Sequence, residues 1–354
     1  MPALALLVVL VVAILVITSL AGGYDAVAVM RAFWRGSFGS SDALLSSTLV
    51  RATPLILAGL AVAFAFRAGI LNIGAEGQIL AGAAAATTVA LTLADRPAAL
   101  VITAALVAGA AGGAAWALLP AILLRWFGVL DVISTIMMNF VALHGVGYLV
   151  RGPLQEVLGI YPQSSTLPDA VHLPMMVPGT RLHLGFALAL VVSIALAVIL
   201  RSTAAGFRIR VTGENPFAAR IAGGIDVQRT GMRVFLMSGA IAGLAGAIEV
   251  LGVTFALYEN LSPGFGYTAI AVALLGALDP VRVMLSGIFF GALEAGAGAM
   301  QRDAGVPSVL VSVIQAMIIL GLLATAWWRA KRAAAPPPVP GASEGERLDE
   351  ATAG

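Results

Sequence analysis

Long apolar stretches recur along nearly the whole chain and constrain its fold more than any other feature of the sequence. A helix needs about 20 mostly apolar residues to cross a bilayer. Sixty per cent of the residues are hydrophobic and only 11% are charged, whereas soluble domains average about 25% charged residues. The apolar runs occupy residues 3–21, 48–66, 70–93, 97–123, 130–150, 184–201, 233–255, 264–279, 281–299 and 307–328. We therefore predict an all-α, polytopic membrane protein of about ten transmembrane helices, with the short run 264–279 as a partial span.

The two ends of the chain differ in character. The first apolar run lacks a basic segment before it and a convincing cleavage site after it, so we expect a retained helix rather than a signal peptide. Residues 1–332 then form a single transmembrane domain. Residues 333–354 are rich in proline, alanine and charged residues, a composition typical of a disordered tail.

The basic residues are distributed unevenly between the two sides of the predicted membrane domain. Ten spans place both termini on one side, and the connections on that side hold Arg67, Arg125, Arg201, Arg208, Arg210, Arg220, Arg229, Arg233, Arg282, Arg329, Lys331 and Arg332. The opposite connections hold Arg31, Arg35, Arg51, Arg96, Arg151, Arg181 and Arg302. Cytoplasmic loops carry the excess of Lys and Arg. Twelve basic residues against seven predict that both termini and the 333–354 tail are cytoplasmic.

Several function classes are excluded by what the sequence lacks. Lys331 is the only lysine and has no glycine-rich loop before it, so the chain cannot form the phosphate-binding G-x-x-x-x-G-K-[ST] loop of an ATPase. The absence of cysteine excludes thiolate metal sites. The three histidines have no metal-ligand spacing, and no nucleophile–base pair is visible. We therefore expect neither catalytic residues nor a metal. No basic stripe indicates nucleic-acid binding, and we expect no nucleic-acid partner.

The most informative polar stretch is the predicted cytoplasmic loop 202–232. Within it, Asn215 is a favourable N-cap and Pro216 a favourable first helical residue, and Gly223 with Gly224 can end the helix. We predict a two-turn helix over about 216–222, with Phe217 and Ile221 on one face because they are four residues apart. Such a helix either docks into a partner protein or rests on the bilayer surface.

Polar residues interrupt the apolar runs between Arg67 and Gln78. If this segment is helical, Asn72 and Glu76 share a face and Gln78 points elsewhere. A carboxylate at membrane depth usually faces the bundle interior or water. The segment either lines a solute path or forms a re-entrant corner in which Glu76 pairs with Arg67 or with backbone amides.

Other polar residues lie deeper in single runs, notably Asn139, Glu249 and Glu294. Each either lines a route through the membrane or ties two helices together through a hydrogen bond, which contributes about 0.6 kcal/mol on average.

Five stretches in order along the chain resemble one family of transporters. They are LAVAFAFRAGILNIGAEGQILAGA (60–83), VISTIMMNFVAL (132–143), GENPFAARIAGGI (213–225), SGAIAGLAGAIEVLG (238–252) and SPGFGYTAIAVALLGALDP (262–280). They resemble the permeases of nucleoside-type ABC importers, a branch of the ribose/branched-chain amino acid permease family. The resemblance covers residues 24 to 328.

The resemblance implies a transport subunit of the bacterial plasma (inner) membrane that is not itself an enzyme. Its partners would be a cytoplasmic ABC ATPase holding ATP and Mg²⁺, a second related permease and an extracellular or periplasmic substrate-binding protein, with lipid around it and a small solute passing through. It would bind no cofactor itself. The solute would be a nucleoside or a simple sugar such as ribose. An ion-coupled secondary transporter using Glu76, Glu249 or Glu294 is the alternative from another class.

Two groups of candidate site residues follow, the first from the resemblance and the second from the polar residues at membrane depth. Coupling to the ATPase would involve Glu214, Asn215, Pro216, Phe217, Ala218, Ala219, Arg220, Ile221 and Gly223. The substrate pathway would involve Asn72, Glu76, Gln78, Asn139 and Glu249. One departure is Arg282, which follows Asp279-Pro280 at a position where a small or apolar residue is expected.

Overall fold

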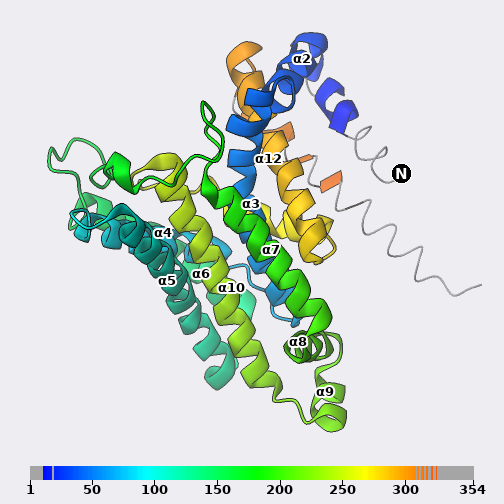
Figure 1. Cartoon of the computed structure of the whole chain (residues 1–354). Coiled ribbons are helices and arrows are strands. Elements are labelled where there is room, and N and C mark those ends of the chain that lie inside the picture. The colour runs from blue at the N-terminus through cyan, green and yellow to red at the C-terminus, as the bar shows by residue number, and fades with distance from the viewer. Residues whose placement is uncertain are drawn as a thin grey trace, which may run out of the picture.

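The computed structural model describes residues 11–307 apart from 18 and 19, together with 309–310, 312–314, 316–317, 320–321 and 324. The named helical elements are α2 (Ala26–Ser37), η1 (Ala43–Thr48), α3 (Leu49–Arg67), α4 (Ala75–Thr92), α5 (Ala98–Phe127), α6 (Asp131–Arg151), η2 (Asp169–Val171), α7 (Leu184–Ser202), α8 (Ala204–Glu214), α9 (Pro216–Gly223), α10 (Val227–Glu249), η3 (Val250–Thr254), α11 (Phe265–Leu275) and α12 (Pro280–Asp303). The long helices form one bundle (Figure 1). The predicted fold class is confirmed in its main feature, an all-helical membrane protein.

Six helical segments among the described residues are long and apolar enough to cross a membrane. They are Ala43–Arg67, Ala98–Phe127, Asp131–Arg151, Leu184–Ser202, Val227–Thr254 and Pro280–Asp303. The chain is therefore a polytopic membrane protein. The total of ten spans and the cytoplasmic termini stay predictions, because about half of each of the runs 3–21 and 307–328 lies outside the described residues, as does the whole tail 333–354.

The remaining two apolar runs form shorter helices. The run 264–279 contains α11, whose 11 residues extend about 16 Å, roughly half of the hydrocarbon core. The run 70–93 contains α4, but its first residues, 70–74, are not helical. Both segments therefore leave backbone ends inside the bundle that other residues must satisfy.

The centre of the bundle is a close three-helix contact between α4, α5 and α10. Glycines allow it: a Cβ at Gly82 would lie 2.3 Å from the Cα of Gly243, and a Cβ at Gly243 would lie 2.3 Å from the carbonyl oxygen of Gly109. Small residues permit such approach of membrane helices, where dispersion contacts rather than the hydrophobic effect hold helices together.

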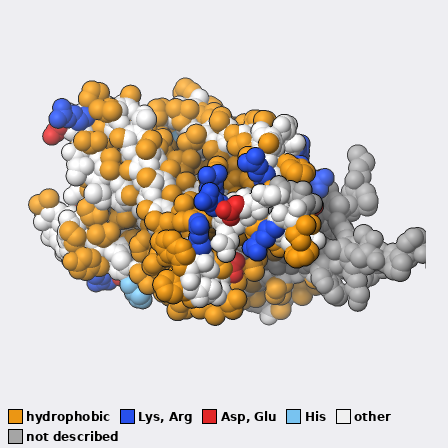
Figure 2. Space-filling view, turned by 90° about the horizontal axis from the view of Figure 1, so that it is seen from below, with side chains coloured by type: hydrophobic (Ala, Val, Ile, Leu, Met, Phe, Trp, Pro, Cys, Tyr) orange, Lys and Arg blue, Asp and Glu red, His pale blue; other side chains and the backbone are white. Residues whose placement is uncertain are grey.

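The arginine-rich connections gather at one end of the bundle. Arg67, Arg125 and Arg201 lie in the last turns of α3, α5 and α7, and α8 and α9 lie at the lower end in Figure 1. Figure 2 shows this end, with arginine side chains near its centre. Arg201 pairs with Asp279 at 2.5 Å and joins the end of α7 to the start of α12. Asp279 also caps α12 by accepting a hydrogen bond from the Arg282 N–H. The unexpected Arg282 therefore lies in the first turn of α12.

Candidate solute path and coupling helix

Helix α9 is defined by the local signals that its sequence carries. The Asn215 side chain accepts a hydrogen bond from the Ala218 N–H at 2.9 Å, and Pro216 is the first helical residue. Gly224 adopts a left-handed conformation with φ 56° and donates its N–H to the carbonyl of Ala219. The caps thus match the prediction, and the helix ends one residue later than expected, at Gly223.

The two apolar side chains of α9 point away from the bundle. Phe217 is 73% exposed and Ile221 is 70% exposed, whereas Ala219 between them is fully buried. Glu214 and Arg220 are exposed as well. The helix therefore rests on the bundle through Ala219 and presents an exposed aromatic and an exposed aliphatic side chain beside charged residues.

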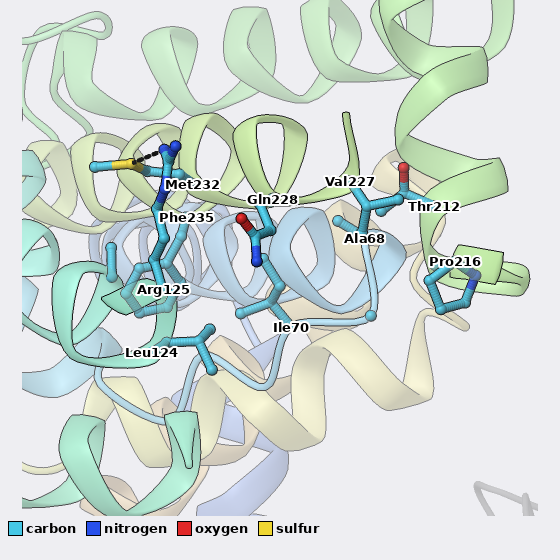
Figure 3. Close-up of a pocket in the computed structure, with 14 residues that line it drawn as sticks. Ala68, Ile70, Leu124, Arg125, Thr212, Pro216, Val227, Gln228, Met232 and Phe235 are labelled. Atoms are coloured by element: carbon cyan, nitrogen blue, oxygen red, sulfur yellow. Dashed lines mark hydrogen bonds between the residues drawn. The ribbon is translucent and has the colours of Figure 1, made fainter. Parts of the chain in front are cut away.

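A cavity of about 350 Å³ lies beside α9, between the end of α3, α5, α8 and α10 (Figure 3). Ile70, Leu124 and Phe235 give it apolar walls, and Gln228 lies near its middle. Arg125 reaches along α10 and contacts the sulfur of Met232 at 3.4 Å. Four segments far apart in the sequence build this cavity, so no local pattern could have indicated it.

Asn72 and Gln78 form a buried hydrogen-bonded pair. The Asn72 amide donates to Gln78 Oε1 at 2.9 Å and to Ser238 Oγ at 2.7 Å, and Asn72 Oδ1 accepts from Gln78 Nε2 at 3.1 Å. The expectation that Asn72 shares a face with Glu76 while Gln78 points elsewhere is wrong. It assumed a continuous helix, whereas α4 begins only at Ala75 and the preceding unwound turn folds Asn72 back onto Gln78.

Glu76 holds the beginning of the short helix α11. Its Oε2 accepts a hydrogen bond from the Gly266 N–H at 2.7 Å, which is one of the amides that a helix start leaves without an intrahelical acceptor. Arg67 does not pair with Glu76. Its guanidinium instead donates to the carbonyls of Leu278 and Ala277 at 3.0 and 3.2 Å. Of the two structural alternatives for Glu76, the backbone-amide one is observed.

Asn139 of α6 completes this polar cluster. Its Oδ1 accepts from the Gly77 N–H at 2.9 Å, and its Nδ2 donates to the Ile73 carbonyl at 2.9 Å and to the Tyr267 hydroxyl at 3.3 Å. Asn139 thereby satisfies the broken backbone before α4 and joins it to α11. Four of the five predicted pathway residues, Asn72, Glu76, Gln78 and Asn139, thus surround one interruption in the membrane domain.

Glu249 lies apart from that cluster. It is the last residue of α10, and it follows Ser238, the cluster's contact on α10, by eleven residues, which corresponds to about 16 Å along the helix. It is buried, with 6% of its surface exposed. The structure therefore does not bring Glu249 together with the other four residues.

Comparison with known proteins decides the family. Residues 44–323 match the family described as "Branched-chain amino acid transport system / permease component", and this range includes every helix from α3 to α12 and both groups of predicted site residues. The chain belongs to this permease family. The permease is therefore a multi-pass membrane transport subunit of the ABC importer class and not an enzyme.

Three relatives show how the permease compares with named proteins. It is 41% identical over 305 residues to the guanosine ABC transporter permease NupP of Bacillus subtilis, covering 85% of this chain and 86% of the relative. It is 39% identical over 298 residues to the glucose ABC transporter permease TsgB13 of Haloferax volcanii, covering 81% and 78%. It is 30% identical over 312 residues to the nucleoside ABC transporter permease NupB of Lactococcus lactis, covering 86% and 85%. No solved structure matches the permease.

Sequence reasoning missed residues of the permease whose role depends on distant partners. Ser238 donates to the Ala61 carbonyl at 2.6 Å while accepting from Asn72, and Tyr267 shares a hydrogen bond with Asn139. A serine and a tyrosine in apolar runs carry no distinctive local pattern. Their signal was polarity at membrane depth, which they share with Thr53, Thr87 and Thr103, whose hydroxyls donate only to carbonyls of their own helices.

Proposed function

We propose that this permease carries nucleosides in an ABC importer whose ATP hydrolysis takes place in a separate ATPase subunit. The observation that carries the proposal is the 41% identity, over nearly the whole length of both chains, to a guanosine permease, supported by the nucleoside permease at 30%. The glucose permease at 39% makes a simple sugar the second candidate. Family membership favours ATP over an ion gradient as the energy source.

The relatives also support a second, related permease as partner. In each of three organisms, two different chains named as permeases for one solute resemble this chain. The first matches at 41%, 30% and 39% and the second at 29%, 28% and 29%. This chain resembles the first of each pair more. We infer that it assembles with a homologue of the second kind, and that a substrate-binding protein delivers solute to the pair.

The exposed face of α9 is the proposed contact with the ATPase. Phe217 and Ile221 would enter an apolar groove of that subunit, and the caps at Asn215 and Gly224 would keep the helix rigid enough to transmit movement. Pro216, the first residue of α9, lines the cavity together with residues of α5 and α10, so movement of α9 would reach these two helices across the cavity.

The polar cluster around residues 72–78 is the proposed inner part of the solute path. It joins α4, α6, α10 and α11 by hydrogen bonds rather than by close apolar packing, so these contacts can exchange for contacts to a hydroxylated solute. Glu249, near the other end of α10, would border the path separately.

Replacing Glu76 by glutamine tests the path proposal. Glutamine keeps an oxygen that can accept from the Gly266 N–H, so we expect the permease to fold and to assemble with its ATPase. Removing the charge from a path residue should lower the initial rate of solute uptake at least fivefold. Glu76→Leu, which removes the acceptor, should also lower the yield of folded protein. Wild-type uptake by Glu76→Gln would show that Glu76 serves only to hold α11.

A labelling experiment tests the predicted orientation, because the chain contains no cysteine. Cysteine in place of the exposed Arg220 of α9 should resist a membrane-impermeant thiol reagent in intact cells and react after permeabilisation. Cysteine in place of Val157, 97% exposed in the loop after α6, should react in intact cells. Labelling of Arg220→Cys from outside would reverse the proposed topology.

Uptake by cells tests the solute class. Cells lacking the gene for this permease should lose uptake of radiolabelled guanosine and regain it when the gene is restored. Unlabelled nucleosides should compete, and ribose or glucose should not. Restored uptake of glucose with no effect on guanosine would replace the nucleoside proposal by the sugar one.

A further inference from the structure

Helix α6 exposes one continuous face that differs from an ordinary lipid-facing surface. Its main packing partners among the described residues are α4 and α5, toward which it buries Asn139, Ala142 and Val146. The opposite face is exposed and carries Ile133, Met137, Phe140, His144 and Tyr148. These positions recur at intervals of three and four residues and therefore form one stripe along the helix.

His144 lies well inside the membrane on this stripe. It precedes Arg151, the last residue of α6, by seven residues, or about 10 Å. The 21 residues of α6 extend about 31 Å, which matches a hydrocarbon core about 30 Å thick. The outer end of the stripe is fixed by an ion pair between Arg151 and Glu259 at 2.6 Å. The imidazole therefore lies at the depth of the lipid tails, not of the headgroups.

Lipid tails cannot satisfy the polar atoms of His144. Its ring makes no hydrogen bond within the part of the chain that the structure describes, and its side chain is exposed on the surface of the isolated subunit. Ionisable side chains at membrane depth are costly and nearly always face the bundle interior or a water-filled cavity. By contrast, α7 exposes Val191, Ile194 and Val198, which lipid solvates well.

We propose that the α6 stripe forms a wall of the outer part of the solute path, before the inner part at the polar cluster around residues 72–78, and that His144 and Tyr148 contact the solute there. The inference rests on the proposed function, since the second permease would supply the opposite wall. An imidazole and a phenol each offer both a donor and an acceptor, which suits the hydroxyls of a neutral ribose or hexose. Phe140, one turn further in, offers an aromatic face against which a nucleobase can stack. These residues would therefore select hydroxylated solutes and favour those with a base.

Thiol labelling tests whether the stripe faces water. Val191 is seven residues from the outer end of α7 and 60% exposed, so it matches His144 in depth. In the assembled complex, a hydrophilic thiol reagent should modify His144→Cys at least tenfold faster than Val191→Cys, and nucleoside should slow the reaction. Equally slow modification of both cysteines would overturn the inference, because it would place His144 against lipid or packed protein.

Transport specificity tests whether the stripe touches the solute. His144→Ala should raise KM for guanosine uptake at least fivefold and change the ratio of guanosine to glucose uptake, while His144→Gln, which keeps hydrogen-bonding groups, should retain more activity. Val191→Ala should match the wild type. ATPase activity stimulated by the binding protein should persist in His144→Ala.

The two failures can be told apart. A wild-type complex that imports nucleosides, with a His144→Ala variant of unchanged KM and solute ratio, would overturn only the role of the stripe. A wild-type complex that imports no nucleoside would overturn the proposed solute, and the labelling rates would then decide by themselves whether the stripe faces water.

Discussion

Replacing Phe217 by alanine should uncouple the permease from its ATPase without unfolding it. The side chain is 73% exposed in the isolated subunit, so its loss removes little packing, and the caps of α9 at Asn215 and Gly224 stay in place. Truncating an aromatic residue at the centre of an interface costs about 2 kcal/mol or more, which corresponds to about 30-fold weaker association. We expect a loss of co-purifying ATPase and of ATP-driven uptake at an unchanged level of membrane-inserted permease.

The chain offers a matched control for that variant. Phe127, at the end of α5, is 72% exposed and lies outside α9. Phe127→Ala should keep the ATPase bound. If both variants kept the ATPase and wild-type uptake, α9 would not be the contact.

Replacing Gly243 by alanine should strongly destabilise the bundle. The new Cβ would lie 2.3 Å from the carbonyl oxygen of Gly109 and 2.8 Å from the backbone of Gly113. Backbone atoms cannot rotate away, so α5 and α10 must separate and lose contacts along their whole length. Overpacking typically costs 1–3 kcal/mol, and we expect a cost above about 3 kcal/mol here, measured as lower yield and lower thermal unfolding temperature in detergent.

Gly145 of α6 provides the control for the same substitution. A Cβ added there meets no atom within 4 Å, and alanine is favoured over glycine in a helix interior by about 0.5–1 kcal/mol. Gly145→Ala should therefore unfold at or above the wild-type temperature. Equal stability of the two variants would mean that α4, α5 and α10 do not meet as closely as described.

Features set by neighbouring residues could be predicted from the sequence. The length and hydrophobicity of the runs indicated membrane helices, and Asn215, Pro216 and Gly224 determined the start and end of α9 within one residue. In each case the physical cause, a cap or an apolar length, is contained in a few consecutive residues.

Features set by distant contacts could not be predicted in this way. Arg67 donates to the carbonyls of Ala277 and Leu278, both in left-handed conformations with φ 49° and 58°, and no local rule places an alanine and a leucine there. Asn72 bonds Gln78 because the chain unwinds before α4, which depends on Asn139 and Ser238 to satisfy the unwound segment. The exposure of His144 likewise depends on which neighbours α6 lacks.

Reconstitution into proteoliposomes tests most directly whether this chain is a nucleoside permease driven by a separate ATPase. Vesicles would contain this permease with its second permease and ATPase, with the binding protein and radiolabelled guanosine on one side and ATP on the other. We expect guanosine accumulation that requires ATP hydrolysis and that disappears when the ATPase is omitted. Accumulation by vesicles containing this chain alone, driven by a proton or sodium gradient without ATP, would contradict the account.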